Sequence, residues 1–375
     1  MAFPLRRHLS PVTFRDEPRF LAEHPLRAVV YAGPGRVAVE DVPLPQVQER
    51  DDVVVEVART AICGSDLHLL HGKTPGMSPG SVIGHEFTGR VAEAGPDVTS
   101  VRQGDLVLGS FLVACGSCGA CSSRRFNFCE RRRALGLGAL AGDLDGAQAE
   151  YVRVPSGDVN LKRLPHDLDE AGQERVLFAG DVLATGFYAA ALGEVASGES
   201  AAVVGAGPVG LFCALAARSL GARVVVIDAD PARARFARDR YDLDALALEP
   251  GANAWEELAA AGPLPDVVFE AVGALPAFKS ALRCARDGGR VVVVGVYGAE
   301  RYDLPMGMVW VRGLQLRFAG MANVQAHWDA ALAAVAKGDF DPSRMITHRL
   351  ALEEAEKGYE LFAAREAMKV VMTPR

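Results

Sequence analysis

Four of the seven cysteines in this chain lie in the stretch CGSCGACSSRRFNFC (115–129). Their spacing is C-x2-C-x2-C-x7-C, and they are Cys115, Cys118, Cys121 and Cys129. Four thiolates complete a tetrahedral zinc shell and leave no coordination position for a substrate. An iron–sulfur cluster also uses four cysteines, but the ferredoxin spacings differ, and two disulfides are disfavoured in a reducing compartment. We therefore expect structural zinc here and the reaction chemistry elsewhere.

A glycine-rich turn, Gly205-Ala206-Gly207-Pro208-Val209-Gly210, is the clearest nucleotide-binding signal. It follows an apolar segment and opens an alanine- and leucine-rich one, the strand–turn–helix context of a dinucleotide-binding loop. Its helix N-terminus can accept a pyrophosphate. Asp228 ends the next apolar segment, where its carboxylate can bind ribose hydroxyls and repel a 2′-phosphate. This favours NAD over NADP, although Arg233 and Arg235 lie nearby. The alternative is a structural glycine turn in an α/β protein that binds no nucleotide.

A second set of metal-binding residue types is more dispersed, in CGSDLH (63–68) and GHE (84–86). A catalytic zinc has three protein ligands and one open position. Cys63 and His85 offer a sulfur and a nitrogen, and a third ligand must come from further along the chain. A lone cysteine is usually a core residue and a lone histidine a hydrogen-bonded polar group. It is the combination of motifs that indicates a metal site.

Two kinds of structure must position these residues. From about residue 26 to 180 the chain has short β-branched segments between Gly and Pro, which predict a mainly β region; the valines of 53–57 suggest a half-buried strand. Beyond 180, apolar segments alternate with helical ones, which predicts a parallel sheet with helices on both faces. From Gly320 onward we expect helix with one more extended piece, returning to the first region. The expected strands beyond 180 are 201–204, 223–228, 266–270 and 290–296.

Composition limits the remaining function classes. The chain has 375 residues, a length that favours two domains, and a formal net charge of −7. Because no basic stretch is longer than Arg131–Arg133, nucleic acid and anionic membrane surfaces are poor partner candidates. No apolar run reaches the roughly 18 residues of a membrane span. Residues 1–25 contain four prolines and no signal-like segment, so we expect an N-terminal extension and a cytoplasmic protein.

Taken together, these motifs resemble the zinc-dependent medium-chain dehydrogenases/reductases, the alcohol dehydrogenase family, over about residues 27–372. The resemblance implies an α/β fold: a GroES-like, partly open β-barrel catalytic domain and an inserted Rossmann domain with a doubly wound parallel sheet. It implies an extension at 1–25, a catalytic domain at 26–182 with a zinc lobe at about 112–132, an NAD-binding domain at 183–318, and a return to the catalytic domain at 319–375. The active site should lie between the two domains.

The resemblance also implies the metal ligands. Cys63 and His85 match the first two ligands of the catalytic zinc. Asp181 stands at the place of the third, which resembles the branch containing glutathione-independent formaldehyde dehydrogenases. Glu86 matches a residue that approaches the metal when water or substrate leaves, a candidate fourth ligand, or else it is a carboxylate paired with an arginine. Asp66 resembles a carboxylate that orients His85.

Other residues match the family's proton relay, cofactor site and substrate pocket. Zinc lowers the pKa of a bound alcohol so that an alkoxide forms, and this expels a hydride to NAD⁺. Ser65 matches the first relay hydroxyl, and His68 matches the outlet to solvent. The residues matched to the cofactor, beyond the glycine turn, Asp228 and Arg233, are Thr185, Gly273, Gly295, Val296 and Lys369, the last near the pyrophosphate. Phe111 matches a pocket-lining position.

Three functions are compatible with this pattern. The first is an NAD- and zinc-dependent dehydrogenase that interconverts a small-molecule alcohol and an aldehyde or ketone. The second is a polyol or biosynthetic-intermediate dehydrogenase, since the small Ser65 widens the pocket for a secondary alcohol. The third is a non-catalytic member that acts as a binding module, since fold alone does not establish activity. A homodimer or homotetramer is expected.

Overall fold

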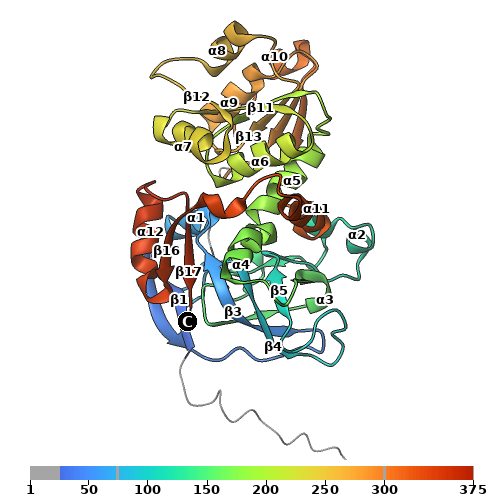
Figure 1. Cartoon of the computed structure of the whole chain (residues 1–375), viewed down its shortest axis with the longest axis vertical. Helices are drawn as coiled ribbons and strands as arrows, with labels where there is room; N and C mark the ends of the chain where they lie inside the picture. Colours follow the sequence, from blue (N-terminus) through green and yellow to red (C-terminus); the bar gives the residue numbers. More distant parts are fainter. Residues whose placement is uncertain (1–25, 73–75, 299–300, 375) are drawn as a thin grey trace, which may run out of the picture.

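The computed structural model describes residues 26–72, 76–298 and 301–374; the predicted extension at 1–25 lies outside them. The chain forms two parts, which Figure 1 shows one above the other with α5 and α11 between them. The α-helices are α1 Gly64–Leu70, α2 Gly119–Ser122, α3 Gly157–Asn160, α4 Glu170–Leu177, α5 Val182–Leu192, α6 Pro208–Ser219, α7 Pro231–Tyr241, α8 Ala254–Ala261, α9 Leu275–Cys284, α10 Met306–Val311, α11 Val324–Lys337 and α12 Ala355–Ala363. Short 3-10 turns are η1 Phe126–Phe128, η2 Ala139–Ala141, η3 Phe178–Gly180, η4 Pro342–Met345 and η5 Leu352–Glu354.

The upper part is built on a six-stranded parallel sheet with the order β12-β11-β10-β13-β14-β15. Alternate strand residues face opposite sides: Val203 packs with α5, α6 and α7, whereas Val204 packs with α8, α9 and α10. The prediction of a parallel sheet covered on both faces is therefore confirmed. Its strands are β10 Ser200–Val204, β11 Arg223–Asp228, β12 Asp244–Ala247, β13 Val267–Glu270, β14 Arg290–Val293 and β15 Gln315–Phe318.

The lower part contains a seven-stranded sheet with the order β16-β17-β3-β4-β5-β9, in which β8 also pairs with β3. Two further pairs, β1-β2 and β6-β7, complete its strands. The strands are β1 Leu26–Gly33, β2 Arg36–Val42, β3 Val53–Ala61, β4 Glu86–Ala94, β5 Leu106–Gly109, β6 Leu112–Val113, β7 Arg133–Ala134, β8 Tyr151–Val154, β9 Leu161–Arg163, β16 Ile346–Ala351 and β17 Lys369–Thr373.

Two strand expectations in the lower part need correction. Segment 53–57 is not half-buried: Val53, Val54, Val55 and Val57 are all buried, because β3 is central in the sheet and both of its faces are covered. The chain after Gly320 contributes two strands to this part, not one, because β16 pairs with β17 and β17 pairs with β3. Both strands therefore join the sheet that contains β3.

Among the described residues, no single helix is both long and apolar enough to cross a membrane. One bent helix pair, Glu170–Gly180 with Val182–Leu192, passes that test by length and composition only.

Candidate active site

A cleft of about 1290 Å³ lies between the two parts and is lined by both. It brings most of the predicted site residues to one surface. From the lower part and α5 they are Cys63, Ser65, His68, His85, Phe111, Asp181, Thr185 and Lys369; from the upper part they are Gly205, Gly207, Pro208, Val209, Asp228, Arg233, Gly295 and Val296.

Three predicted metal ligands converge at one wall of this cleft. Cys63 lies just before α1, His85 just before β4, and Asp181 at the start of α5. The Oδ2 atom of Asp181 lies 3.4 Å from both Cys63 Sγ and His85 Nε2. Donors about 2.0–2.3 Å from one tetrahedral zinc would be roughly 3.3–3.8 Å apart. The donor set therefore fits zinc in both chemistry and spacing.

Electrostatics at this wall also favour a cation. Burial raises the pKa of the Cys63 thiol, and the Asp181 carboxylate raises it further. Burial lowers the pKa of His85, but Asp66, Asp181 and Cys63 together outweigh it, so this pKa is well above its usual value. Burial raises the pKa of Asp181, but the hydrogen bond and charge of His85 together with the charge of Lys369 outweigh this and lower it. A divalent cation would offset the charge that a thiolate and a carboxylate accumulate here.

Lys369, which the resemblance matched to a basic residue near the pyrophosphate, lines the cleft, but its ammonium is engaged by other groups of the chain. Its side chain is only 1% exposed, and its ammonium donates to both carboxylate oxygens of Glu86 at 2.6 Å and to the carbonyl of Ile62 at 3.0 Å. All three donor hydrogens are thus occupied within the lower part, beside the metal-ligand set. The alternative of an arginine partner for Glu86 is also wrong, since the partner is Lys369. Burial raises the pKa of Glu86 to about 7, although Lys369 opposes the rise.

The neighbouring relay residues lie at the same wall. Ser65 Oγ is 3.2 Å from His85 Nε2, and Phe111 packs with its ring centroid 5.9 Å from that of His85. Thr185 lies one turn into α5, where its N–H and hydroxyl both donate to the carbonyl of Asp181. His68, on α1, also lines the cleft.

The glycine turn connects β10 to α6 as predicted. Gly205 has a φ of +108°, which L side chains rarely adopt. A Cβ on Gly210 would lie 1.9 Å from the Gly205 carbonyl, so this glycine is required for close packing of helix on strand. Asp228 ends β11, and its carboxylate accepts the N–H groups of Ala206 and Asp230 at 2.7 and 2.8 Å. This ties the carboxylate to the turn that would approach the cofactor.

The remaining residues matched to the cofactor, Gly273, Gly295 and Val296, lie close together at the ends of β13 and β14. A Cβ on Gly273 would lie 2.4 Å from the Val296 carbonyl, and one on Gly295 would lie 2.1 Å from Gly273 N. Gly295 and Val296 line the cleft, whereas Gly273 is not part of its lining. Sequence reasoning missed Glu270, a buried carboxylate whose Oε1 accepts the N–H groups of Val272 and Gly273 and so shapes this corner.

The four clustered cysteines form a second donor set, separate from the cleft. Their sulfur atoms lie within 4.8 Å of one another, with Cys118 Sγ 3.5 Å from Cys121 Sγ and 3.9 Å from Cys129 Sγ. Two sulfurs bound to one tetrahedral zinc would be about 3.8 Å apart. A disulfide would need roughly 2.0 Å, so these spacings suit a metal and not two disulfides.

The lobe that carries these cysteines is hydrogen-bonded to a segment, residues 321–323, part of which lines the cleft. Asn323 accepts from Phe126 N at 3.2 Å and donates to the carbonyl of Arg124 at 2.9 Å. Asn127 donates to the carbonyl of Met321 at 3.1 Å. Because Met321 lines the cleft, the lobe contacts the active site indirectly through this segment. These two asparagines were not recognised from the sequence, where each is an isolated polar residue.

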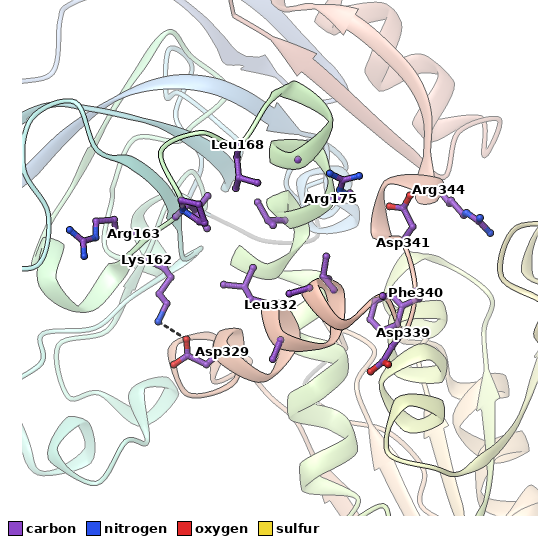
Figure 2. A pocket seen from close by; sticks show the side chains of 18 of the residues that line it. Lys162, Arg163, Leu168, Arg175, Asp329, Leu332, Asp339, Phe340, Asp341 and Arg344 are labelled. Carbon is purple, nitrogen blue, oxygen red and sulfur yellow. Dashed lines mark ion pairs between the residues drawn. The ribbon is translucent and has the colours of Figure 1, made fainter.

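A separate hollow of about 900 Å³ lies between α4, α11 and η4 (Figure 2). An ion pair from Lys162 on β9 to Asp329 on α11 crosses its edge. None of the predicted site residues lines it, so we assign the chemistry to the cleft.

Comparison with known proteins agrees with this geometry. The alcohol dehydrogenase GroES-like domain matches residues 49–165, and the zinc-binding dehydrogenase domain matches residues 208–337. This chain belongs to the zinc-dependent medium-chain dehydrogenase/reductase family. The predicted fold class is thereby confirmed: a GroES-like domain together with a Rossmann-type parallel-sheet domain.

Relatives of this dehydrogenase cover nearly its whole length. A glutathione-independent formaldehyde dehydrogenase of Pseudomonas aeruginosa is 31% identical over 93% of this chain and 97% of its own. The solved alcohol dehydrogenase TADH from Thermus sp. ATN1 is 43% identical, with a TM-score of 0.87 over 93% of this chain and 100% of its own. A zinc-binding dehydrogenase from Sinorhizobium meliloti 1021, solved with bound NADP, is 32% identical, with a TM-score of 0.80 over 94% and 100%. The family supports an alcohol dehydrogenase-type oxidoreductase that uses zinc and a nucleotide cofactor.

Proposed function

We propose that this protein is an NAD-dependent zinc alcohol dehydrogenase that interconverts a small-molecule alcohol and an aldehyde or ketone. The observation that carries the proposal is the convergence of Cys63, His85 and Asp181 on a cleft shared with the glycine turn. These three residues would hold a catalytic zinc, and Cys115, Cys118, Cys121 and Cys129 would hold a structural one. When bound, zinc lowers the pKa of an alcohol hydroxyl and NAD⁺ accepts a hydride.

The chain's own groups would orient the substrate and move its proton. Ser65 Oγ, close to His85 and on the cleft wall, would take the hydroxyl proton, and His68 would pass it to solvent. Phe111 would form an apolar side of the substrate pocket. Because Lys369 engages both of its oxygens, Glu86 can approach the metal only if that ion pair opens.

NAD is the proposed cofactor in preference to NADP. Asp228 stands at the end of β11, where a ribose would lie, and a carboxylate there repels a 2′-phosphate. Arg233 lines the same region of the cleft and would neutralise cofactor phosphate charge. We expect kcat/KM to be higher with NAD⁺ than with NADP⁺, and Asp228→Ser to narrow that ratio. Equal activity with both cofactors in the unmodified protein would contradict this role of Asp228.

The decisive experiment combines metal content with NADH formation on a panel of alcohols, aldehydes and polyols. We expect the native protein to contain two zinc ions per chain. The Asp181→Ala variant should contain one zinc ion per chain and should lose turnover. Asp239→Ala, on the exposed face of α7, is the matched control and should keep both metals. If Asp181→Ala retains both zinc ions and full turnover, the ligand assignment is wrong.

The same panel separates the alternatives. A polyol or biosynthetic-intermediate dehydrogenase would respond to polyols or secondary alcohols and little to primary ones. A non-catalytic binding module would contain both metals and bind NADH without turning over any substrate of the panel. The convergence of Cys63, His85 and Asp181 and the nearby hydroxyl of Ser65 favour a catalytic function.

We further propose a homodimer or homotetramer that uses the edge of the parallel sheet. Strand β15 is at that edge, and four large apolar side chains are exposed on it and on the preceding helix α10; Trp310 is 80% exposed. Such a patch is typical of an association surface. It consists of Met306, Trp310, Val311 and Phe318. Trp310→Glu should lower the molar mass measured by light scattering, and an unchanged mass would contradict this surface.

We also propose that the chain divides into domains at 26–182, 183–318 and 319–375. A cytoplasmic location is proposed as well. Limited proteolysis, which cuts preferentially in exposed interdomain segments, would test the division. Cell fractionation would test the location.

A further inference from the structure

Gln148 lies beside the proposed catalytic metal site and touches two of the three segments that build it, those that carry Cys63 and His85. Its amide Nε2 donates to the carbonyl of Ala61 and to Oδ2 of Asp66, both at 3.2 Å. Its backbone N–H donates to the carbonyl of Ile83, so that this segment runs alongside the chain that leads to His85. Gln148 has no exposed surface.

Gly84 makes room for this side chain. A Cβ at Gly84 would lie 2.2 Å from Cγ and 2.6 Å from Cδ of Gln148, and the φ of Gly84 is +87°. A side chain at position 84 would therefore collide with Gln148, which accounts for the glycine that precedes His85. Because of this contact, a shift of the Gln148 side chain would also shift the backbone next to His85, the proposed histidine ligand.

Tyr359 approaches the same carboxylate from α12, near the end of the chain. Its hydroxyl lies 2.7 Å from Oε1 of Gln148 and 3.2 Å from Oδ2 of Asp66, and the side chain is 4% exposed. Cys63 N also donates to Oδ2 of Asp66 at 2.9 Å, so that oxygen accepts from Cys63 N and Gln148 Nε2. The single hydrogen of the Tyr359 hydroxyl goes to Gln148 Oε1, the shorter contact, and so fixes the amide that donates to Asp66. The Asp66 carboxylate is thereby held in one orientation.

The other carboxylate oxygen of Asp66 faces His85. Oδ1 lies 3.5 Å from His85 Nδ1, and both atoms are buried without another hydrogen-bond partner among the described residues. With Nδ1 turned to Asp66, Nε2 of His85 points to Ser65 and Asp181. The orientation of the metal-binding nitrogen thus depends on where Asp66 is held.

We propose that Gln148 and Tyr359 are positioning residues for the catalytic metal site, acting on His85 through Asp66. The inference rests on the proposed function, in which Cys63, His85 and Asp181 bind zinc. It makes α12 a support of the metal site although no residue of that helix is a ligand. Loss of such outer partners typically weakens metal binding on the order of 10- to 100-fold.

The test measures zinc affinity at each site in the full chain by competition with a chromophoric chelator. Tyr359→Phe removes one oxygen and adds no atom, and Gln148→Met keeps the length of the side chain. Both should weaken catalytic-site binding roughly 10-fold or more and leave the four-cysteine site unchanged. Tyr241→Phe is the matched control, because Tyr241 is a buried tyrosine that donates to Pro342 O, away from both donor sets.

Cobalt substituted at the catalytic site adds a spectroscopic readout, since its visible absorption depends on ligand geometry. An altered spectrum in Tyr359→Phe, with an unaltered one in Tyr241→Phe, supports the proposal. Unchanged zinc affinity and an unchanged cobalt spectrum in Tyr359→Phe overturn it. Failure of that variant to fold in saturating zinc also overturns it, because the role of the hydroxyl would then be structural. A native protein that binds only one zinc would instead refute the proposed function itself.

Discussion

Replacement of Lys369 by methionine tests the buried ion pair beside the metal site. Glu86 and Lys369 are 0% and 1% exposed, and Nζ lies 2.6 Å from both carboxylate oxygens. At an effective dielectric constant of about 20, opposite charges about 3–4 Å apart attract by roughly 4–5 kcal/mol. Removing one partner of a buried pair costs about 3–5 kcal/mol, since the Glu86 carboxyl is then buried without its cation, either as an unpaired charge or with an added proton. We expect Lys369→Met to lower the free energy of unfolding by that amount.

The double variant Glu86→Gln/Lys369→Met distinguishes a lost ion pair from lost packing. Because it removes both charges and nearly preserves side-chain volume, it should recover at least about 2 kcal/mol relative to Lys369→Met. The assay is urea unfolding with zinc present, after reversibility has been checked, on the native protein, both single variants and the double variant. A loss below about 1 kcal/mol in Lys369→Met, or purely additive effects in the double variant, would refute the reasoning.

Three further predictions concern other parts of the chain. Cys129→Ser should reduce zinc from two ions per chain to one, measured by elemental analysis, and lower the unfolding temperature by several degrees, because one of four sulfur ligands is lost. Gly84→Ala should destabilise the protein by roughly 2–5 kcal/mol in urea, since it adds backbone strain to a clash with Gln148; a loss under 1 kcal/mol would contradict this. Burial raises the pKa of Asp266, but hydrogen bonds from Ser200 and Arg286 outweigh it and lower this pKa to about 2. The free energy of unfolding of the native protein should therefore exceed that of Asp266→Asn by a constant amount above about pH 4, and this difference should shrink as pH falls towards 2. A difference that does not change with pH would exclude the lowered pKa.

Local motifs were predictable because their geometry is set within a few residues. The cysteine spacing at 115–129 and the glycine turn at 205–210 each specify a compact loop, and the structure builds both loops. Strand–helix alternation after residue 180 likewise predicted the parallel sheet, because burial on both faces requires continuous apolar strands. These properties depend on neighbours in sequence.

Partners distant in sequence were decided by the tertiary structure. Lys369 and Glu86 are separated by 283 positions, and Tyr359 and Asp66 by 293. The sequence alone placed Lys369 near a pyrophosphate and assigned nothing to Gln148 or Tyr359. The residues next to a charged or amide side chain in the sequence do not show which group will pair with it. A buried polar group needs a partner, and the tertiary fold decides which complementary group lies within reach. The residue types of the site were thus determined by the sequence, and the support that orients them was decided only when the segment carrying Tyr359 and Lys369 packed against the region of Asp66 and Glu86.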